Sequence, residues 1–182
     1  TAAAMQTAAK EALDVSREPA YVHKLYGLDR DATREYGTRC LIARRLVERG
    51  VRFVQLYHST WDDHHDLNKN LKTNCDMTDQ PAAALVRDLA ERGLLDSTLV
   101  IVMGEMGRSP RVNKDAGRDH WPQCGFSLLT GGGVREGMIH GATDRQAAYP
   151  ISDPVHPADL VATIYHLLGI DPHLLVHDRM GR

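Results

Sequence analysis

The stretch TLVIVMGEMGRSP, residues 98–110, decides the fold, because a short apolar run ends there in a polar loop. Residues 98–103 are continuously apolar, as in a strand that is buried on both faces. The loop that follows, residues 104–123, carries carboxylate, imidazole and guanidinium side chains. In open parallel sheets, ligands bind beyond the carboxyl ends of the strands. The stretch therefore predicts an α/β protein whose functional groups lie at one edge of a sheet.

Helical and strand-like segments alternate on both sides of this stretch. Residues 33–49 repeat apolar side chains at spacings of three and four and are followed by Gly50, which is typical of an amphipathic helix. Its last turns carry Arg44, Arg45 and Arg49, where cations interact favourably with the helix dipole. The further elements predicted are a strand over residues 51–57, a loop over 58–77, a helix over 78–93 with Pro81 in its first turn, a strand over 124–130 and a helix over 157–168. This order predicts a three-layer α/β/α architecture with a mostly parallel sheet.

Residues 1–32 differ in character from the rest of the chain. They begin with the Ala-rich, polar sequence TAAAMQTAAKEAL, which predicts a short helix, and then break at Pro19 and Gly27. We interpret them as a peripheral segment that precedes the α/β core.

The bulk composition limits the classes of function. The chain has 182 residues, 42% of them hydrophobic and 25% charged, which is ordinary for one globular domain with a core. A formal net charge of −2 gives no basis for a nucleic-acid partner. No apolar run approaches the ~18 residues that a membrane span requires. The cysteines, Cys40, Cys75 and Cys124, are far apart and predict free thiols, not a disulfide framework or a zinc knot.

The first polar loop contains WDDHHDLN, residues 61–68. Carboxylate oxygen together with neutral imidazole is the ligand mixture for zinc, manganese or iron, and for magnesium or calcium where carboxylates dominate. Asp62 and His64 lie two residues apart, so they point the same way in an extended loop. Three neighbours compete for the same role: Asp63, His65 and Asp66. The alternative is a solvated polar loop whose aspartates cap a helix.

The second polar loop holds Glu105, Arg108, Asp119 and His120. Glu105 follows the strand by two residues, where a rigid scaffold can hold a ligand. Arg108 is a fixed cation that can clamp an oxyanion such as phosphate or sulfate. Asp119 and His120 are an adjacent carboxylate and imidazole, although Asp119 can instead pair with a neighbouring arginine and His120 can pack on a tryptophan.

The two loops together make a stronger prediction than either one. If the strands before them are near neighbours in a parallel sheet, both loops open on the same edge. Carboxylates gathered in one place need a cation to neutralise them. The sequence thus predicts a divalent metal site. The sequence GGGV at residues 131–134 lacks the Lys-Ser/Thr of a phosphate loop, so no nucleotide cofactor is expected.

Five stretches of the chain carry a family resemblance: RCLIARRLVERGVRFVQLYHSTWDDHHDLN (39–68), DQPAAALVRDLAERGLLDSTLVIVMGEMGRSP (79–110), GRDHWP (117–122), LLTGGGVREGMIHGATD (128–144) and HPADLVATIYHLLGID (156–171). They resemble the bacterial family called domain of unknown function 1501, and the resemblance runs from about residue 17 to the end of the chain. This family is placed in the alkaline phosphatase superfamily, with sulfatases and cofactor-independent phosphoglycerate mutases, and its members often carry a twin-arginine export signal. The resemblance therefore implies an alkaline-phosphatase-like core and a periplasmic or exported protein.

The resemblance also implies roles for single residues. Asp62, His64 and His120 match the Asp and two His that hold one metal in the superfamily. Glu105 matches the Asp of a second metal, whose partner His is absent here. In an alternative alignment, Asp119 and His120 are the second-metal pair. The superfamily's nucleophile lies near the amino end of its domain, so residues 1–182 are interpreted as the carboxyl-terminal part of one incomplete domain.

The leading hypothesis is a metal-dependent hydrolase of phosphate or sulfate esters, in which Arg108 clamps the anion. A first alternative is a degenerate, non-catalytic member of the superfamily that binds a sugar or a partner protein. A second alternative is a structural fragment that is stable only with the missing amino-terminal part of the same domain. A sheet without its first strands leaves an unpaired apolar edge, so association with further protein is expected.

Overall fold

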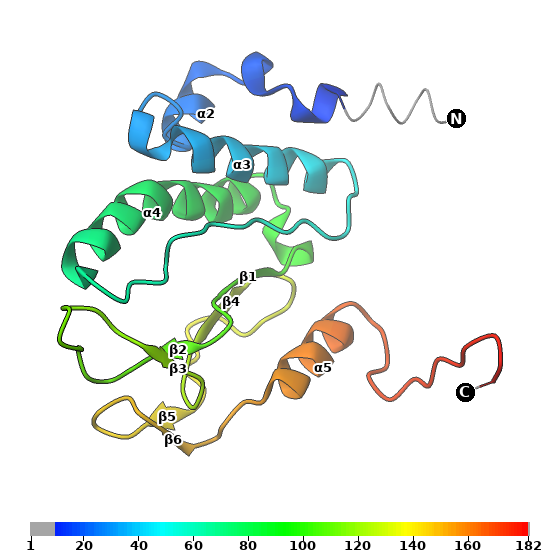
Figure 1. The fold of residues 1–182 in the computed structure, drawn as a ribbon. Helices are drawn as coiled ribbons and strands as arrows, with labels where there is room; N and C mark the ends of the chain where they lie inside the picture. Colours follow the sequence, from blue (N-terminus) through cyan, green and yellow to red (C-terminus); the bar gives the residue numbers. More distant parts are fainter. Residues whose placement is uncertain (1–9, 182) are drawn as a thin grey trace.

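A computed structural model describes residues 10–181, with helices in the first half and short strands in most of the second (Figure 1). A mixed α/β protein is thereby confirmed. The elements, in chain order, are the 3₁₀ turn η1 (Val15–Arg17), helices α2 (Ala20–Leu25), α3 (Asp31–Glu48) and α4 (Leu67–Glu91), the 3₁₀ turn η2 (Leu95–Ser97), strands β1 (Val100–Met103), β2 (Gly107–Arg108), β3 (His120–Trp121), β4 (Ser127–Thr130), β5 (Ala142–Thr143) and β6 (Pro150–Ser152), and helix α5 (Pro157–Leu167).

Helix α3 confirms the predicted helix over residues 33–49. It carries Asp31 in its first turn, where a carboxylate suits the helix dipole, and Gly50 follows it with a φ of 80°. A positive φ is accessible to glycine at little cost, so Gly50 lets the chain leave the helix. The Gly50 N–H donates to the Val47 carbonyl at 2.9 Å and closes the last turn.

Helix α4 begins at Leu67, so the loop predicted as far as residue 77 ends at Asp66 instead. The prediction was wrong because polar side chains face inward over this part of the helix. Asn74 and Thr78 are both buried, and the Thr78 hydroxyl donates to the Asn74 carbonyl at 2.8 Å. Buried polar groups that keep hydrogen bonds are tolerated, and they hide the apolar periodicity of a helix.

Pro81 lies inside α4 and not in a first turn, which corrects a further expectation. The side chain is fully buried. Proline removes one backbone donor from a helix interior, and the helix nevertheless continues to Glu91. Gly93 follows with a φ of 67°, in agreement with the stop predicted there.

The segment 51–57 runs as an extended chain beside the helices but forms no strand, so that prediction was wrong (Figure 1). Of its backbone N–H groups, only that of Val51 is hydrogen-bonded within residues 10–181, to the last turn of α3. Leu56 packs against the helical core, whereas Phe53 and Tyr57 are 72% and 70% exposed. A strand requires a neighbour to satisfy its backbone, and this segment has none in the described chain.

Strand β1 confirms the strand predicted over residues 98–103, and β4 confirms the later part of the one predicted over 124–130. The two pair antiparallel, with Val100 opposite Thr130. The pairs β2–β3 and β5–β6 are antiparallel as well. No parallel pair occurs among residues 10–181, so the expected parallel sheet is not seen there. The predicted polar loop after β1 instead contains the short β2–β3 hairpin.

The glycines after β4 form a tight turn and not a phosphate loop. Gly131 and Gly132 have φ values of 72° and 58°. A Cβ on Gly131 would lie 2.4 Å from the Thr98 carbonyl oxygen, so only glycine fits against the start of the neighbouring strand.

The hydrophobic core lies among the helices α2, α3 and α4. Its buried cluster consists of Val22, Tyr26, Cys40, Leu41 and Ala84, from helices α2, α3 and α4. The segment 1–32 therefore contributes Val22 and Tyr26 to this cluster. The very start of its predicted helix, residues 1–9, lies outside the described residues, and its peripheral place in a larger domain stays a prediction.

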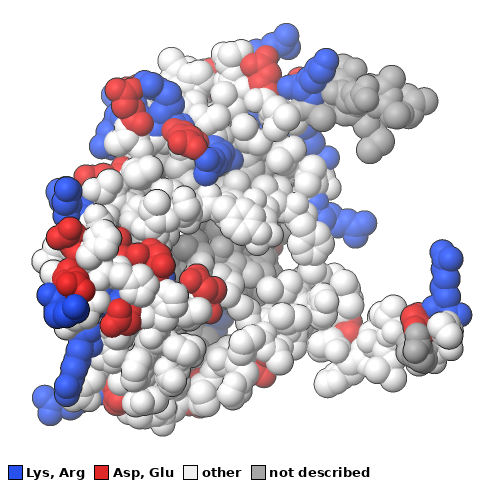
Figure 2. Space-filling model, viewed as in Figure 1, with Lys and Arg blue, Asp and Glu red and all other residues white. Residues whose placement is uncertain are grey.

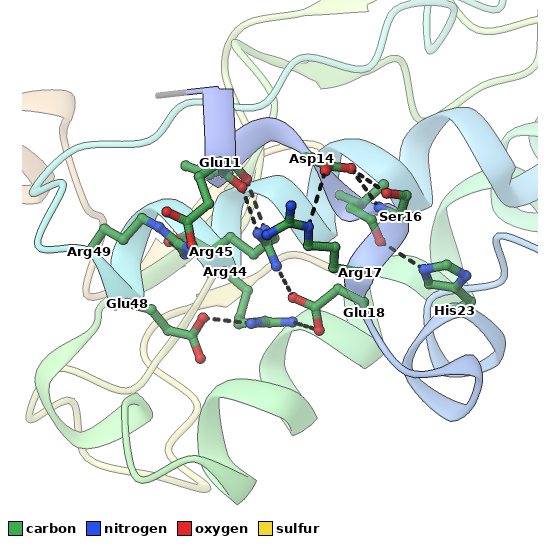
Figure 3. Close-up of polar contacts among 12 residues, drawn as sticks. Glu11, Asp14, Ser16, Arg17, Glu18, His23, Arg44, Arg45, Glu48 and Arg49 are labelled. Atoms are coloured by element: carbon green, nitrogen blue, oxygen red, sulfur yellow. Dashed lines mark hydrogen bonds and ion pairs between the residues drawn. The ribbon is translucent and has the colours of Figure 1, made fainter. Parts of the chain in front are cut away.

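Arg44 sits inside this helical layer at the centre of an ion-pair network, part of which Figure 3 shows. Its side chain is 2% exposed and pairs with Glu18 at 2.8 Å, Glu48 at 2.5 Å and Asp88 at 3.0 Å. Arg45 pairs with the other oxygen of Glu18. Burial would raise the pKa of Glu18, but these two guanidinium groups outweigh it and hold the pKa below its usual range. Arg44 and Arg45, which were attributed to the helix dipole from their sequence positions, are therefore buried and paired with carboxylates.

Helix α5 confirms the helix predicted over residues 157–168, and Asp159 caps it by accepting a hydrogen bond from the His156 N–H at 2.8 Å. None of its residues is buried.

No helix in the described part of the chain has the length and apolar character that crossing a membrane requires. The three cysteines are free thiols, as predicted.

Candidate metal centre

Two loops that are far apart in sequence are joined by backbone hydrogen bonds to form the candidate site. The Arg118 N–H donates to the Asp63 carbonyl and the Leu67 N–H donates to the Ala116 carbonyl, each at 2.9 Å. His65 and Ala116 form an isolated antiparallel bridge between these contacts. The predicted convergence of the two loops is therefore present, although it arises from this pairing and not from a parallel sheet.

Gly117 makes the close approach of the loops possible. A Cβ at this position would lie 2.0 Å from the backbone carbon of His64, which is closer than any side chain can come. Because Gly117 is buried against the first loop, the residues that follow it are delivered directly beside Asp62 and His64. The nearest of these are Asp119 and His120, the latter in strand β3.

Three side chains converge in this place: Asp62, His64 and His120. The Asp62 Oδ1 lies 3.1 Å from the His64 Nε2 and 2.8 Å from the His120 Nε2. The two Nε2 atoms are 3.3 Å apart. One carboxylate oxygen and two imidazole nitrogens thus form a compact triangle that can hold a metal ion.

The size of the triangle fits a divalent metal. Ligand atoms about 2.0–2.1 Å from a tetrahedral zinc lie about 3.3 Å from one another, and an octahedral ion with bonds of that length sets them about 2.9–3.0 Å apart. The three observed separations cover this range. Three protein ligands are also fewer than either geometry needs, and the side chains are about half exposed. Such a set leaves coordination positions open to a substrate or to water, as catalytic sites do.

The charge around Asp62 favours its ionised form, which is the form that binds metal. The His120 imidazole, followed by the Arg108 guanidinium and the nearby His64, lowers the pKa of Asp62 below its usual range. The Asp62 carboxylate is thus available as an anionic ligand.

Asp119 lies beside the triangle and contacts the His64 ring at Nδ1, the nitrogen that faces away from the triangle. Its Oδ1 is 3.1 Å from the His64 Nδ1 and accepts a hydrogen bond from the Asn113 Nδ2, also at 3.1 Å. These contacts, that of His64 first, lower the pKa of Asp119. The group of three whose ligand atoms all converge does not include Asp119. The alternative pairing of Asp119 with a neighbouring arginine is not formed, because the Arg118 guanidinium instead donates to the Ser109 carbonyl at 2.5 Å.

Arg108 and Glu105 approach the triangle from strand β2 and the turn before it. Arg108 Nη1 donates to the Asp62 Oδ1 at 2.5 Å, so its positive charge lies directly at the site. Glu105 lies 3.9 Å from the Arg108 Nη2 and is mostly exposed. Glu105 is not part of the converging group, and its role at a second metal stays a prediction.

The three neighbours that compete for the same role, Asp63, His65 and Asp66, are not in the converging group. Asp63 is buried, and its backbone holds the second loop. His65 forms the bridge to Ala116, and Asp66 takes the position before helix α4. The structure therefore brings together Asp62 and His64, the pair that was expected because the two residues lie two positions apart.

Asn113 was not identified from the sequence, yet it ties the site together. Its Nδ2 donates to the His64 carbonyl at 3.0 Å as well as to Asp119, while its Oδ1 accepts from the Gly117 N–H at 2.9 Å. The available signal was the spacing of an Asn four residues before a Gly in a polar loop, which is typical of a side chain that caps its own turn. That pattern is frequent in loops without function.

The fold and the site define a mixed α/β protein with a candidate metal centre of two histidines and one aspartate. The chain belongs to the family described as protein of unknown function DUF1501, whose model matches residues 1–182. This match confirms the family resemblance found in the sequence and extends it to the first residues. Comparisons with curated proteins and with solved structures give no match.

Proposed function

We propose that this protein is a metal-dependent hydrolase of phosphate or sulfate esters, with Asp62, His64 and His120 as the metal ligands. The observation that carries the proposal is the triangle of one carboxylate oxygen and two Nε2 atoms with edges of 2.8–3.3 Å. Zinc fits this donor set well, and manganese is an alternative of similar ligand preference; magnesium and calcium prefer more oxygen ligands.

A divalent cation bound there supplies Lewis-acid stabilisation of the negative charge on the ester group. Asp62 contributes the anionic ligand, and the two imidazoles bind without adding charge, so the centre keeps a net positive charge that attracts an oxyanion. Arg108 adds a second cation, held at Asp62 by its Nη1, with Nη2 towards Glu105. A guanidinium so placed binds and orients a phosphate or sulfate oxygen.

We also propose that the chain forms part of a larger alkaline-phosphatase-like core with a mostly parallel sheet, completed by amino-terminal residues of the same domain. The backbone of segment 51–57, which has no strand partner among the described residues, and its exposed Phe53 and Tyr57 support this. Figure 2 shows this face hollowed between the helices and the strands, with mostly uncharged residues in the hollow. Such a surface suits further strands. By family resemblance alone, we propose export to the periplasm.

The test of function combines metal analysis with turnover. The full-length protein, with the amino-terminal residues proposed to complete the domain, is purified, dialysed, analysed for bound metals, and assayed with an aryl phosphate and an aryl sulfate after loading with zinc or manganese. We expect about one metal per chain at the triangle and hydrolysis of one of the two esters. His120→Ala is expected to lose both, whereas His166→Ala, which removes an exposed histidine of α5, keeps both.

The principal alternative is a non-catalytic member that binds a sugar or a partner protein. In a member without metal, Asp62, His64 and His120 would be joined only by hydrogen bonds, which their separations of 2.8–3.3 Å also allow. Metal retained without turnover of either ester would reject the hydrolase and leave the metal site. If the wild-type protein retains no metal and has the same metal content and activity as His120→Ala, both the hydrolase and the metal site are rejected.

A further inference from the structure

His64 is held from two sides, and the two contacts have different character. Its Nε2 faces the Asp62 Oδ1 at 3.1 Å and the His120 Nε2 at 3.3 Å. Its Nδ1 faces the Asp119 Oδ1 at 3.1 Å, on the far side of the ring. The ring thus bridges the ligand triangle and a carboxylate outside it.

We infer that Asp119 is a positioning residue that fixes the tautomer and orientation of His64, and that it is not itself a metal ligand; this inference rests on the metal site of the proposed function. An ionised carboxylate only accepts hydrogen bonds. A neutral His64 therefore carries its proton on Nδ1 and presents the Nε2 lone pair to the triangle. Most metal-binding histidines donate their other N–H in this way, which raises their basicity as ligands.

Asn113 extends the arrangement by one further layer. It donates to the Asp119 Oδ1 and to the His64 carbonyl, so it fixes the carboxylate and the histidine backbone relative to each other. Its own amide cannot rotate freely, because the Oδ1 accepts from the Asp115 N–H at 3.0 Å and the Gly117 N–H at 2.9 Å. A carboxylate that is held on both sides loses little conformational freedom when it orients the ring.

His120 provides an internal contrast. Its Nε2 also points into the triangle, but its Nδ1 contacts no partner in the described part of the chain. The two histidine ligands therefore differ in what fixes them: His64 depends on Asp119 and Asn113, and His120 depends on its place in strand β3. Loss of Asp119 is accordingly expected to weaken metal binding without removing a ligand.

The test measures metal affinity and coordination directly. Co²⁺ is titrated into the wild-type protein and Asp119→Asn, with competition by a chromophoric chelator, and the visible absorption of the bound ion is recorded. The asparagine oxygen is held in the same place by the Asn113 Nδ2 but carries no charge, so it is a weaker acceptor for the His64 Nδ1–H than the carboxylate and fixes the tautomer less firmly. We expect the affinity of Asp119→Asn to fall about 10–100-fold while the absorption spectrum of the saturated protein stays that of the wild type.

Three further variants define the effect. Asp119→Glu keeps a carboxylate and is expected to restore part of the affinity. Asp115→Asn is the matched control, because this carboxylate lies in the same loop and only its backbone makes the contacts described. Its affinity is expected to equal that of the wild type. Should Asp119→Asn not fold, Asn113→Ala frees the carboxylate from one of its two partners and is expected to lower the affinity in the same direction.

The outcomes separate this inference from the proposed function. Wild-type affinity in both Asp119→Asn and Asn113→Ala, or a spectrum in Asp119→Asn that reports a changed coordination number, would overturn the positioning role. A wild-type protein that binds no Co²⁺ would overturn the metal site with it. The expected affinities and spectra, in a protein that hydrolyses neither ester, would support the positioning role and reject only the hydrolase.

Discussion

Replacement of Arg44 by Met is predicted to cost about 3 kcal/mol of folding stability. Removing one partner of a buried ion pair costs roughly 3–5 kcal/mol, because the other charge stays buried without compensation. The buried partners here are Glu18 and Asp88, each of which keeps other contacts. Glu18 still pairs with Arg45, and Asp88 still accepts from the Tyr26 hydroxyl at 2.9 Å. The remaining contacts place the expected loss at the lower end of the range.

Urea unfolding followed by circular dichroism at 222 nm measures this loss, because the affected network lies in the helical layer. With a slope of about 2 kcal/mol per molar urea, a loss of about 3 kcal/mol lowers the midpoint by about 1.5 M. The control is Arg87→Met, which removes an exposed arginine paired with Glu91 at 2.6 Å. An exposed pair contributes at most about 1 kcal/mol. A midpoint for Arg44→Met that lies within error of the control would refute the reasoning.

Three other results are expected. Gly117→Ala should cost about 1–3 kcal/mol of folding stability, since its Cβ would overlap the backbone of His64. Gly104→Ala, which has room for a Cβ, is the control and should be neutral when both variants are compared with the wild type by thermal unfolding. Burial raises the pKa of the Cys40 thiol to about 12, so mass spectrometry after iodoacetamide treatment of the native protein should show this cysteine unmodified and the two others alkylated. Because the pKa of Glu18 is lower in the folded chain than in the unfolded one, its contribution to stability is complete above about pH 4.3 and disappears as the pH falls through the folded value. Unfolding titrations at several acidic pH values should therefore show a smaller slope of stability against pH in Glu18→Gln than in the wild type.

The sequence predicted best where local chemistry alone sets the structure. Helix α3 ends at a glycine with positive φ, and β1 is an uninterrupted apolar run, so both were found. Asp62 and His64 were paired correctly because a spacing of two residues in an extended loop is itself a geometric constraint. The choice of His120 as their partner was implied by the family resemblance and not by spacing along the chain.

The failures concern long-range contacts. Segment 51–57 has the composition of a strand, but strand formation depends on a neighbour that no local pattern specifies. The inward-facing Asn74 and Thr78 removed the apolar stripe by which α4 would have been recognised earlier. Arg44 looked like an ordinary cation near a helix end, because its partners Glu18 and Asp88 lie on other elements. Asn113 joins the two loops through one distant contact, the hydrogen bond of its Nδ2 to the His64 carbonyl, which no local pattern specifies.

The backbone pairing between the two polar loops has a consequence for the order of folding. His64 and Asp119 are separated by 55 positions, so bringing them together closes a long loop. Closing it costs roughly 3.5 kcal/mol of chain entropy beyond a length-independent term. Helices α3 and α4 form from local contacts within each helix, and the Glu48–Arg92 pair between them spans 44 positions, so the helical layer is expected to form first. An intermediate with only this helical pair holds Asp62 and His64 near each other but not His120, so the triangle of ligand atoms is completed among the last contacts to form.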